Sequence, residues 1–254
     1  MKLKFALIVA VLSAASLYAQ QRGAAPAAAP PTPRVQAPID VAGYWVAIVS
    51  EDWRWRMGVG LKGDYGYLTL SPEGKKAGDS WDPAKDEGAG EQCKTYGAVG
   101  VMRLPTRLHI TWDNDDTMKV ETDAGTQTRL FHFTGAAPQG QIPSWQGYSA
   151  ARWEAEGPRG ARGAPQAAPR AGQLRVMTTN LRAGYIYKHG VPYSGNARLT
   201  EFFEINPGLQ GETYLSVTAT VDDPQYWAQP FVRTVHFRKE ADGSKWSPSA
   251  CSSR

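Results

Sequence analysis

Residues 106–134 read TRLHITWDNDDTMKVETDAGTQTRLFHFT, and this stretch decides the fold class. Three runs rich in Thr, Val, Phe and Leu are separated by DNDD at 113–116 and DAG at 123–125. Runs of this composition are typical of strands, and clusters of Asp, Asn and Gly are typical of hairpin turns. The stretch therefore predicts three consecutive strands joined by two hairpins.

Similar strand-like runs recur along most of the chain, whereas no long segment has the 3.6-residue period of a helix. The predicted strands are 43–57, 66–70, 106–112, 117–122, 126–134, 147–153, 173–182, 197–205, 212–221 and 230–238. Two short helices are expected at 71–77 and 82–87. So many strands in one domain predict an all-β fold, an antiparallel β-barrel, with a β-sandwich as the alternative.

The first 19 residues have the pattern of a secretory signal peptide. Lys2 and Lys4 precede an apolar run that begins at Phe5, and small residues follow. The apolar part is shorter than the roughly 20 residues that a membrane-spanning helix needs. We therefore expect an exported protein, periplasmic or extracellular, with no stable membrane insertion.

Two stretches are too rich in Pro, Ala and Gly to form a core. Residues 20–38 are expected to be a disordered tether, and 156–172 a flexible insertion in a single β domain spanning 39–254. Removing the seven basic residues of 1–38 and 156–172 from the formal charge of +4 leaves −3. Nucleic-acid binding is not expected, because it normally requires a basic face on the fold itself.

The chain has two cysteines, Cys93 and Cys251. Export favours a disulfide between them, and two free thiols are the alternative. A bridge across this separation would contribute up to about 5 kcal/mol in the chain-entropy model.

An internal echo links two distant segments. Residues 107–133 begin with Arg-Leu and end with Arg129 followed by Leu-Phe-His132-Phe, and residues 198–237 begin with Arg-Leu and end with Arg233 followed by Thr-Val-His236-Phe. Both are meanders that close on R-x-x-H-F. The echo predicts two similar halves, unless it is a coincidence between strands of like composition.

Strict alternation along 43–57 would place Glu51 in a row of aromatic and aliphatic side chains. Glu201 has the same setting within 197–205. A buried carboxylate without a partner has a raised pKa, as a general acid requires. Glu51, Glu201 and His132 are therefore candidate catalytic residues. The alternatives are structural pairing of the glutamates with Arg54, Arg182 or Arg198, or a bulge that lets Glu51 reach solvent.

Candidate ligand contacts come from three places in the chain. Residues 52–56 alternate charge and indole, a pattern that can stack planar rings and bind a carboxylate, or can form an ordinary packed strand. The loop around Tyr185 and the echoed motif supply the others. The candidate ligand-binding residues are Trp53, Arg54, Trp55, Arg129, Tyr185 and His236.

The spacing of the four histidines matches no local metal motif, so neither a metal nor a cofactor is expected. The sequence also has no G-x-S-x-G, P-loop, dinucleotide-binding or C-x-x-C motif. The common hydrolase, nucleotide and thiol-redox chemistries therefore have no local support.

Gly43-Tyr44-Trp45 at the start of the first predicted strand resembles the G-x-W signature of the lipocalins and wider calycins. The resemblance implies a barrel in which Trp45 closes one end, with Arg233 or Arg238 as its cap. A disulfide from a middle strand to the C-terminal tail is also common in lipocalins, and Cys93 and Cys251 are placed in a similar way. The chain departs from the family in having more strand-like runs than eight. It also resembles exported bacterial proteins of unassigned function.

Three function classes follow from these observations. The leading hypothesis is an exported barrel that binds a small, partly apolar molecule. The first alternative is an enzyme on the same barrel, a hydratase, isomerase or cyclase that uses buried glutamates as acid and base. The second alternative is a β-sandwich that binds carbohydrate or cell-envelope material through exposed Trp residues. The sequence leaves open whether the chain is an enzyme and what its oligomeric state is.

Overall fold

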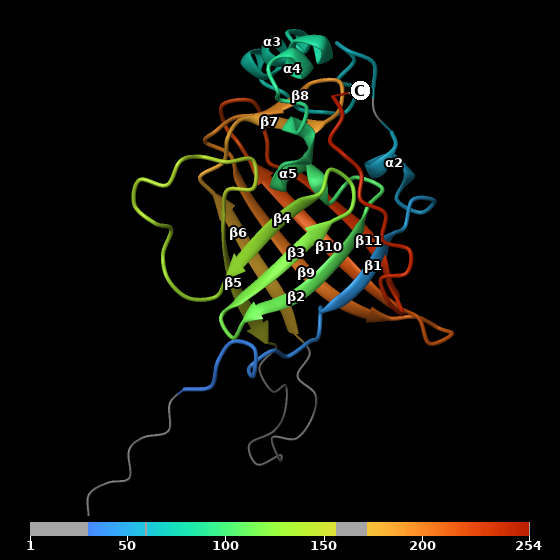
Figure 1. Ribbon diagram of the computed structural model, residues 1–254. Helices are drawn as coiled ribbons and strands as arrows, with labels where there is room; N and C mark the ends of the chain where they lie inside the picture. Colours follow the sequence, from blue (N-terminus) through green and yellow to red (C-terminus); the bar gives the residue numbers. More distant parts are fainter. Residues whose placement is uncertain (1–29, 59, 156–171, 254) are drawn as a thin grey trace, which may run out of the picture. The chain divides into compact units, whose positions relative to one another are not determined.

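A computed structural model describes residues 30–58, 60–155 and 172–253 (Figure 1). The chain divides into two units, 1–31 and 32–254, and the following account concerns the second. The expected signal peptide, residues 20–29 of the expected tether and residues 156–171 of the expected insertion lie outside the described residues.

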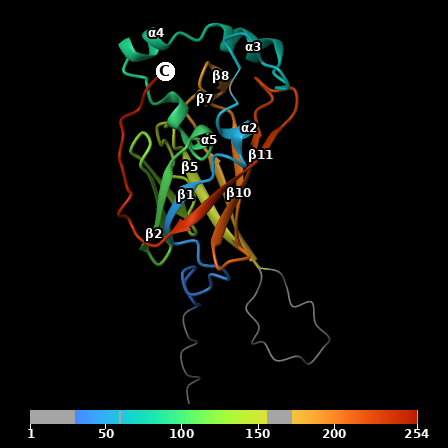
Figure 2. The same ribbon diagram turned by 90° about the vertical axis from the view of Figure 1, so that its right-hand side faces the viewer.

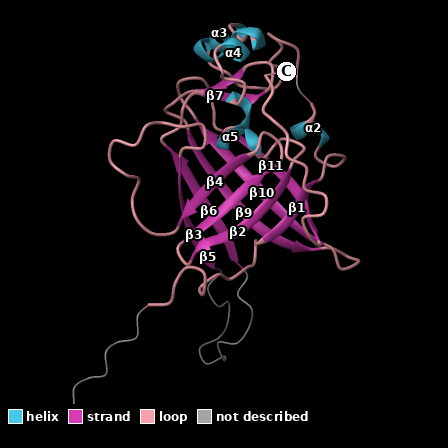
Figure 3. Cartoon of the chain, in the orientation of Figure 1, coloured by secondary structure: helices cyan, strands magenta, loops and turns pink. Residues whose placement is uncertain are grey.

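Nine strands of the described chain close into one barrel, in the order β1-β11-β10-β9-β6-β5-β4-β3-β2 (Figures 1 and 3). Their bounds are β1 Gly43–Ala47, β2 Arg107–Asn114, β3 Thr117–Thr122, β4 Gln127–His132, β5 Tyr148–Ala155, β6 Gly172–Thr179, β9 Arg198–Pro207, β10 Thr213–Asp222 and β11 Phe231–Glu240. The all-β barrel expected from the sequence is thus confirmed. The barrel is mixed, because β4 and β5 pair in parallel where a fully antiparallel barrel was expected.

Short helices and a two-stranded sheet form a cap at one end of the barrel (Figures 1 and 3). The cap contains α2 Trp53–Arg56, α3 Pro72–Asp79, α4 Pro83–Gly88, the 3₁₀ helix η1 Lys94–Tyr96, α5 Ala98–Val101, β7 Gly184–Tyr187 and β8 Val191–Tyr193. The two helices expected from the sequence are confirmed. Ser71 and Asp82 cap α3 and α4 with side-chain hydrogen bonds, and a proline follows each cap.

The long first strand predicted over 43–57 is wrong, because β1 ends at Ala47 and a helical turn follows. The backbone N–H groups of Trp55 and Arg56 donate to the carbonyl of Asp52. The Arg56 side chain also forms an ion pair with Asp52, four residues earlier, at 3.2 Å. Residues four apart meet on a helix but lie far apart on a strand, so this buried pair favours the turn. The run 66–70 also fails as a strand, since only Leu70 makes an isolated bridge.

Two clusters of buried apolar side chains fill the molecule, one in the barrel and one at the cap end. Trp45 is fully buried in the barrel cluster, and its indole N–H donates to the carbonyl of Val41 at 3.0 Å. The cation over its ring is Lys239 at 5.3 Å, where the lipocalin resemblance implied Arg233 or Arg238.

The echoed segments form equivalent parts of one barrel. Strands β2-β3-β4 and β9-β10-β11 are both antiparallel meanders. The arginine of each R-x-x-H-F motif, Arg129 or Arg233, is buried on the final strand of its meander. The two similar halves are therefore two meanders within a single closed sheet.

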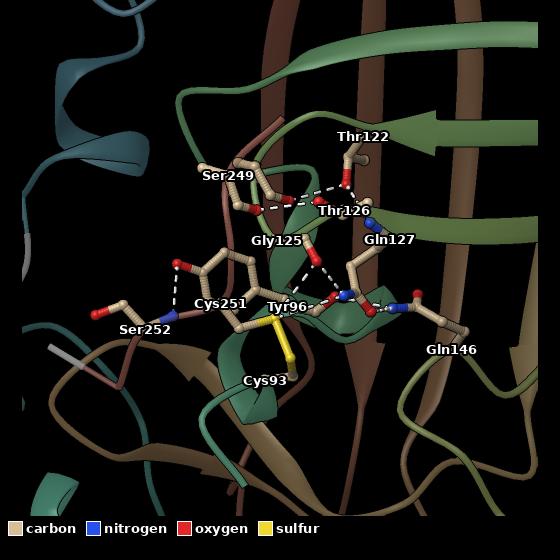
Figure 4. The surroundings of a disulfide bond; sticks show 11 residues. Cys93, Tyr96, Thr122, Gly125, Thr126, Gln127, Gln146, Ser249, Cys251 and Ser252 are labelled. Carbon is tan, nitrogen blue, oxygen red and sulfur yellow. Dashed lines mark hydrogen bonds between the residues drawn. A yellow bond between two sulfur atoms is a disulfide. The ribbon is translucent and has the colours of Figure 1, made fainter. Parts of the chain in front are cut away.

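A disulfide joins Cys93 to Cys251, with the two Cα atoms 5.1 Å apart, as one of the two alternatives predicted. The chain after β11 runs along the outside of the barrel toward the cap (Figure 2). Figure 4 shows the bridge beside Tyr96, whose hydroxyl accepts the N–H of Ser252. The side-chain amide of Gln127, on β4, donates to Cys251 Sγ at 3.5 Å and so connects the bridge to that strand. The bridge thereby fixes the C-terminal segment between the barrel and the cap.

The expected tether is in part attached to the barrel. The Trp153 indole donates to the carbonyl of Pro33 at 2.8 Å, and the Arg34 N–H donates to the carbonyl of Asp115. Residues 32–38 therefore pack against the end of the barrel that lies opposite the cap.

Candidate functional site

A pocket of about 230 Å³ lies in the cap, between the loop after α2 and the β7–β8 sheet. We call it the cap pocket. It is lined by Gly58, Gly60, Asp64, Tyr65, Gly66, Tyr67, Leu68, Tyr187 and Val191. Its walls are mostly aromatic and aliphatic, and at Gly58 and Gly60 the loop packs so closely on its own backbone that a Cβ would meet the carbonyls of Arg54 and Asp64. Small-molecule sites typically combine such walls with a few polar groups.

Besides Asp64 and Tyr65, the polar side chains that line the cap pocket are two tyrosines whose hydroxyls lie close together. The hydroxyl oxygens of Tyr67 and Tyr187 lie 3.5 Å apart. Tyr187 is buried, whereas Tyr67 is 46% exposed. Burial raises the pKa of Tyr187 well above that of a free tyrosine, although the positive charge of Arg233 acts to lower it. Tyr187 is therefore protonated at neutral pH and able to donate a hydrogen bond to a ligand.

Two residues predicted from the 52–56 pattern contact the wall of this pocket. The Arg54 guanidinium lies over the rings of Tyr67 at 4.4 Å and Trp55 at 5.1 Å. Trp55 meets Tyr67 edge to face at 6.0 Å. A cation stacked on an aromatic face is stabilising and restricts both side chains. Arg54 and Trp55 thus hold the exposed wall of the cap pocket.

Behind the pocket floor lies a group of buried arginines. Arg56 donates to the carbonyls of Met102 and Leu104 at 3.0 and 2.9 Å and pairs with Asp52. Arg103 donates to the carbonyl of Arg56 at 2.7 Å, and its guanidinium lies 4.3 Å from the centre of the Tyr187 ring. Burial lowers the pKa of Arg56 and of Arg103 to about 10, so both are charged at neutral pH.

Arg233 enters this group from β11. One of its Nη atoms donates to the carbonyl of Val99. Its Nε and other Nη atoms are buried and have no hydrogen-bond partner among the described residues. Burial lowers its pKa, and the neighbouring Tyr187 and Glu201 act to raise it. A buried N–H group without a hydrogen-bond partner lowers stability, so these atoms of Arg233 need a partner such as a bound ligand or a water molecule.

Glu201, one of the two glutamates singled out in the sequence, lies inside the barrel and is paired. Its carboxylate accepts two bonds from the Arg129 guanidinium, at 2.6 and 3.2 Å, and both side chains are 1% exposed. Arg129 also donates to the Thr178 hydroxyl, which lies 2.8 Å from that of Ser149. The arrangement is a structural Glu–Arg pair, the alternative to catalysis, but its arginine is Arg129, which was expected to bind ligand, and not Arg54, Arg182 or Arg198.

The expectation that Glu51 lies in an apolar row is wrong, because the helical turn puts it on the surface. A hydrogen bond from the Ser50 hydroxyl lowers the pKa of Glu51, whereas a general acid needs a raised one. Glu51 and Glu201 therefore do not share a cavity.

The histidine candidates occupy separate places on the barrel. His132 stacks on Tyr148 with the ring centres 4.8 Å apart, and burial lowers its pKa. The Nδ1 atom of His236 lies 2.8 Å from a carboxylate oxygen of the buried Asp52. The structure thus connects His236 to the turn at Asp52 and Arg56, behind the cap pocket, and does not connect His132 to it.

Two predicted ligand contacts lie elsewhere in the cap. Tyr185 donates to the Asp86 carboxylate at 3.0 Å and stands beside Lys94, and burial raises its pKa to about 12. Trp53 is 60% exposed, whereas Trp55 is partly buried against both apolar clusters. The two indoles do not form a flat exposed row.

The described residues contain no group of three or more His, Cys, Asp or Glu side chains that could hold a metal ion. None of the helices in this part of the chain is long and apolar enough to span a bilayer. Comparisons with models of known families, with characterised proteins and with solved structures found no match.

Sequence reasoning missed Tyr67 and Arg103 as site residues, whereas Tyr187 belongs to the loop around Tyr185 that was expected to contact a ligand. Tyr67 and Tyr187 are 120 residues apart, so no local pattern relates them. Arg233 did carry a signal, because the echoed motif aligns it with Arg129. Two aligned arginines at inward positions of a barrel could have marked a polar interior.

Proposed function

We propose that the protein is an exported β-barrel that binds a small, partly apolar molecule in the cap pocket. The observation that carries the proposal is an aromatic pocket lined by Tyr67 and Tyr187, whose hydroxyl oxygens lie 3.5 Å apart. Its modest volume suits a ligand of about one ring.

Export and a relation to the lipocalins belong to the same proposal. A disulfide is typical of proteins that fold in an oxidising compartment. A closed barrel with a buried Trp45 near the start of its first strand is what the G-x-W resemblance implies. Nine strands and the parallel β4–β5 pair set this barrel apart from a simple eight-stranded one. A fold alone does not determine function, so the site must carry the argument.

The geometry favours binding over acid–base catalysis. Glu51 is exposed, and Glu201 is bound by Arg129 in the interior. Two carboxylates that act on one substrate need to flank it at roughly 5–10 Å. The cap pocket instead offers neutral hydroxyl donors and apolar contacts.

Native mass spectrometry of the mature protein, exported to a bacterial periplasm and purified gently, tests this proposal. We expect a stoichiometric organic adduct. Leu68 is partly buried and lines the pocket, so Leu68→Trp should fill it and abolish the adduct. The matched control is Leu209→Trp at a fully exposed position, which should leave the adduct unchanged.

An adduct that survives Leu68→Trp would place the ligand elsewhere and contradict the proposal. The proposal would also be contradicted if no adduct is found and no member of a panel of small aromatic acids, amides and alcohols raises the melting temperature. Ligand binding to the native state raises the melting temperature by mass action, so the panel detects binding even while the natural ligand is unidentified.

A further inference from the structure

The buried charge behind the cap pocket is unbalanced. The described chain buries four guanidinium groups, those of Arg56, Arg103, Arg129 and Arg233, and only two of them have a carboxylate partner. Asp52 pairs with Arg56, and Glu201 pairs with Arg129. In the described part of the chain, neither Arg103 nor Arg233 has a carboxylate within salt-bridge distance. Burying a charge without a counter-ion is strongly unfavourable, so this arrangement lowers the stability of the ligand-free protein.

Both unpaired cations act on the floor of the cap pocket. The Arg103 guanidinium lies against the face of the Tyr187 ring. The charges of Arg233 and Arg103 both act to lower the pKa of the Tyr187 hydroxyl, against the larger effect of burial. An anionic oxygen at that hydroxyl would be attracted by the same two charges, which act against the penalty that burial places on it. In a low-dielectric interior such interactions are much stronger than in water.

The two hydroxyls on the floor are arranged to share an acceptor. At 3.5 Å, the bond between Tyr67 and Tyr187 is longer than a strong O–H···O hydrogen bond. When the two hydroxyls bond to each other, only one of them donates. An anionic oxygen seated beside both could accept two short, charge-assisted bonds in its place.

The rim of the cap pocket carries a negative charge, opposite to the charge of the arginines behind the pocket. Asp64 is exposed at the rim, and its carboxylate accepts the N–H of Gly66 at 3.0 Å. A negative charge at the rim disfavours an anion there and favours one at the floor. The electrostatic potential of the pocket therefore becomes more positive from the rim toward the buried arginines.

We propose that the cap pocket recognises its ligand through an anionic oxygen, such as a carboxylate, which the hydroxyls of Tyr67 and Tyr187 bind and the charges of Arg103 and Arg233 stabilise. This inference rests on the proposed binding function and adds the chemical class of the ligand. The apolar part of the ligand lies against Leu68 and Val191, with its acidic end on the floor.

Isothermal titration calorimetry with two matched probes tests the inference. Benzoate and benzamide have nearly the same shape but differ in charge. We expect benzoate to bind at least tenfold more tightly than benzamide. Tyr67→Phe removes one hydroxyl from a half-exposed side chain, so it should weaken benzoate about tenfold without impairing folding.

Arg233 supplies a second and independent pair of variants. Arg233→Met removes an unpaired buried charge, so it should raise the stability of the ligand-free protein while it weakens benzoate roughly tenfold or more. Arg233→Lys keeps the charge and should retain the preference for benzoate. A merely structural Arg233 would instead show a loss of stability in Arg233→Met with no change in benzoate affinity.

Failure of this inference can be distinguished from failure of the proposed function. If benzoate and benzamide bind equally and Leu68→Trp abolishes both, the binding function stands and anion recognition is overturned. If benzoate does not bind at millimolar concentration, anion recognition is likewise overturned, while the native adduct still decides the proposed function. Benzoate binding that is insensitive to Tyr67→Phe and Arg233→Met would overturn the assignment of the floor.

Discussion

Replacing Glu201 by Gln tests the polar interior of the barrel most directly. The carboxylate makes two contacts with Arg129, and both side chains are almost completely buried. Glutamine keeps the shape but removes the charge. Arg129 would then be a buried cation without a counter-ion, in a region where Arg233 already lacks one.

The expected loss is large for a single isosteric change. Breaking a buried ion pair by removing one partner costs about 3–5 kcal/mol of the free energy of unfolding. For a domain of this size, that corresponds to a fall in melting temperature of roughly 6–20 °C. Urea denaturation at neutral pH measures the loss, and the slope of unfolding free energy against urea should stay unchanged if the native state is otherwise intact.

Two further variants complete the test. Glu204→Gln, an exposed position on the same strand, should change stability by no more than about 0.5 kcal/mol. The double variant Arg129→Met/Glu201→Leu removes both charges and should recover most of the loss, because well-packed apolar side chains replace a buried pair at little cost. A loss below about 1 kcal/mol for Glu201→Gln, or a double variant as unstable as the single one, would refute the reasoning.

Three other predictions concern the bridge, a histidine and the helical turn. Cys93→Ser should lower the free energy of unfolding by up to about 5 kcal/mol. Ellman's reagent should react with the wild-type protein only after reduction. Reaction before reduction would exclude the Cys93–Cys251 bond. Burial lowers the pKa of His132, so its contribution to stability is present above pH 6.5, the ordinary histidine pKa, and is lost as the pH falls through the lower pKa of the folded state. An NMR titration of the His132 ring should give a midpoint below 6.5, and a midpoint above it would contradict the burial argument. Trp55→Ala should destabilise the protein by about 2–4 kcal/mol and Trp53→Ala by less than about 0.5 kcal/mol in urea unfolding; equal losses would contradict the turn.

Local alternation was enough to predict most of the barrel strands. The predicted strand 117–122 coincides with β3, and the turn that follows it contains Gly125, whose φ of +74° suits glycine. The run 43–57 failed because its second half is set by distant partners. Arg56 bonds to carbonyls at residues 102 and 104, and no pattern within 43–57 contains that information.

The candidate site was predictable only in part, for the same reason. Arg54 and Trp55 were found because charge and indole alternate locally, although they lie on a helical turn. Tyr67 and Tyr187 become a site only when the loop after α2 meets the β7–β8 sheet. The pairing of Glu201 with Arg129 joins residues 72 positions apart, so the sequence could name both residues without showing that they pair.

The pairing of β1 with β11 has a consequence for the order of events in folding. These strands are the first and last of the barrel in the chain, and Tyr44 lies opposite Glu240. When the chain emerges with its N-terminus first, the meander β2-β3-β4 can form early, whereas β9-β10-β11 and the closure of the ring both wait for β11. Contacts of such high sequence separation slow folding, because a long loop must close before they form.

The disulfide imposes the same order, because Cys251 follows β11 in the chain. Until β11 has emerged, the free edges of β1 and β10 expose unpaired backbone groups that can join other chains. The intermediates most prone to aggregation are therefore chains that end before β11, since the sheet loses its free edges only when β11 pairs with β1 and β10.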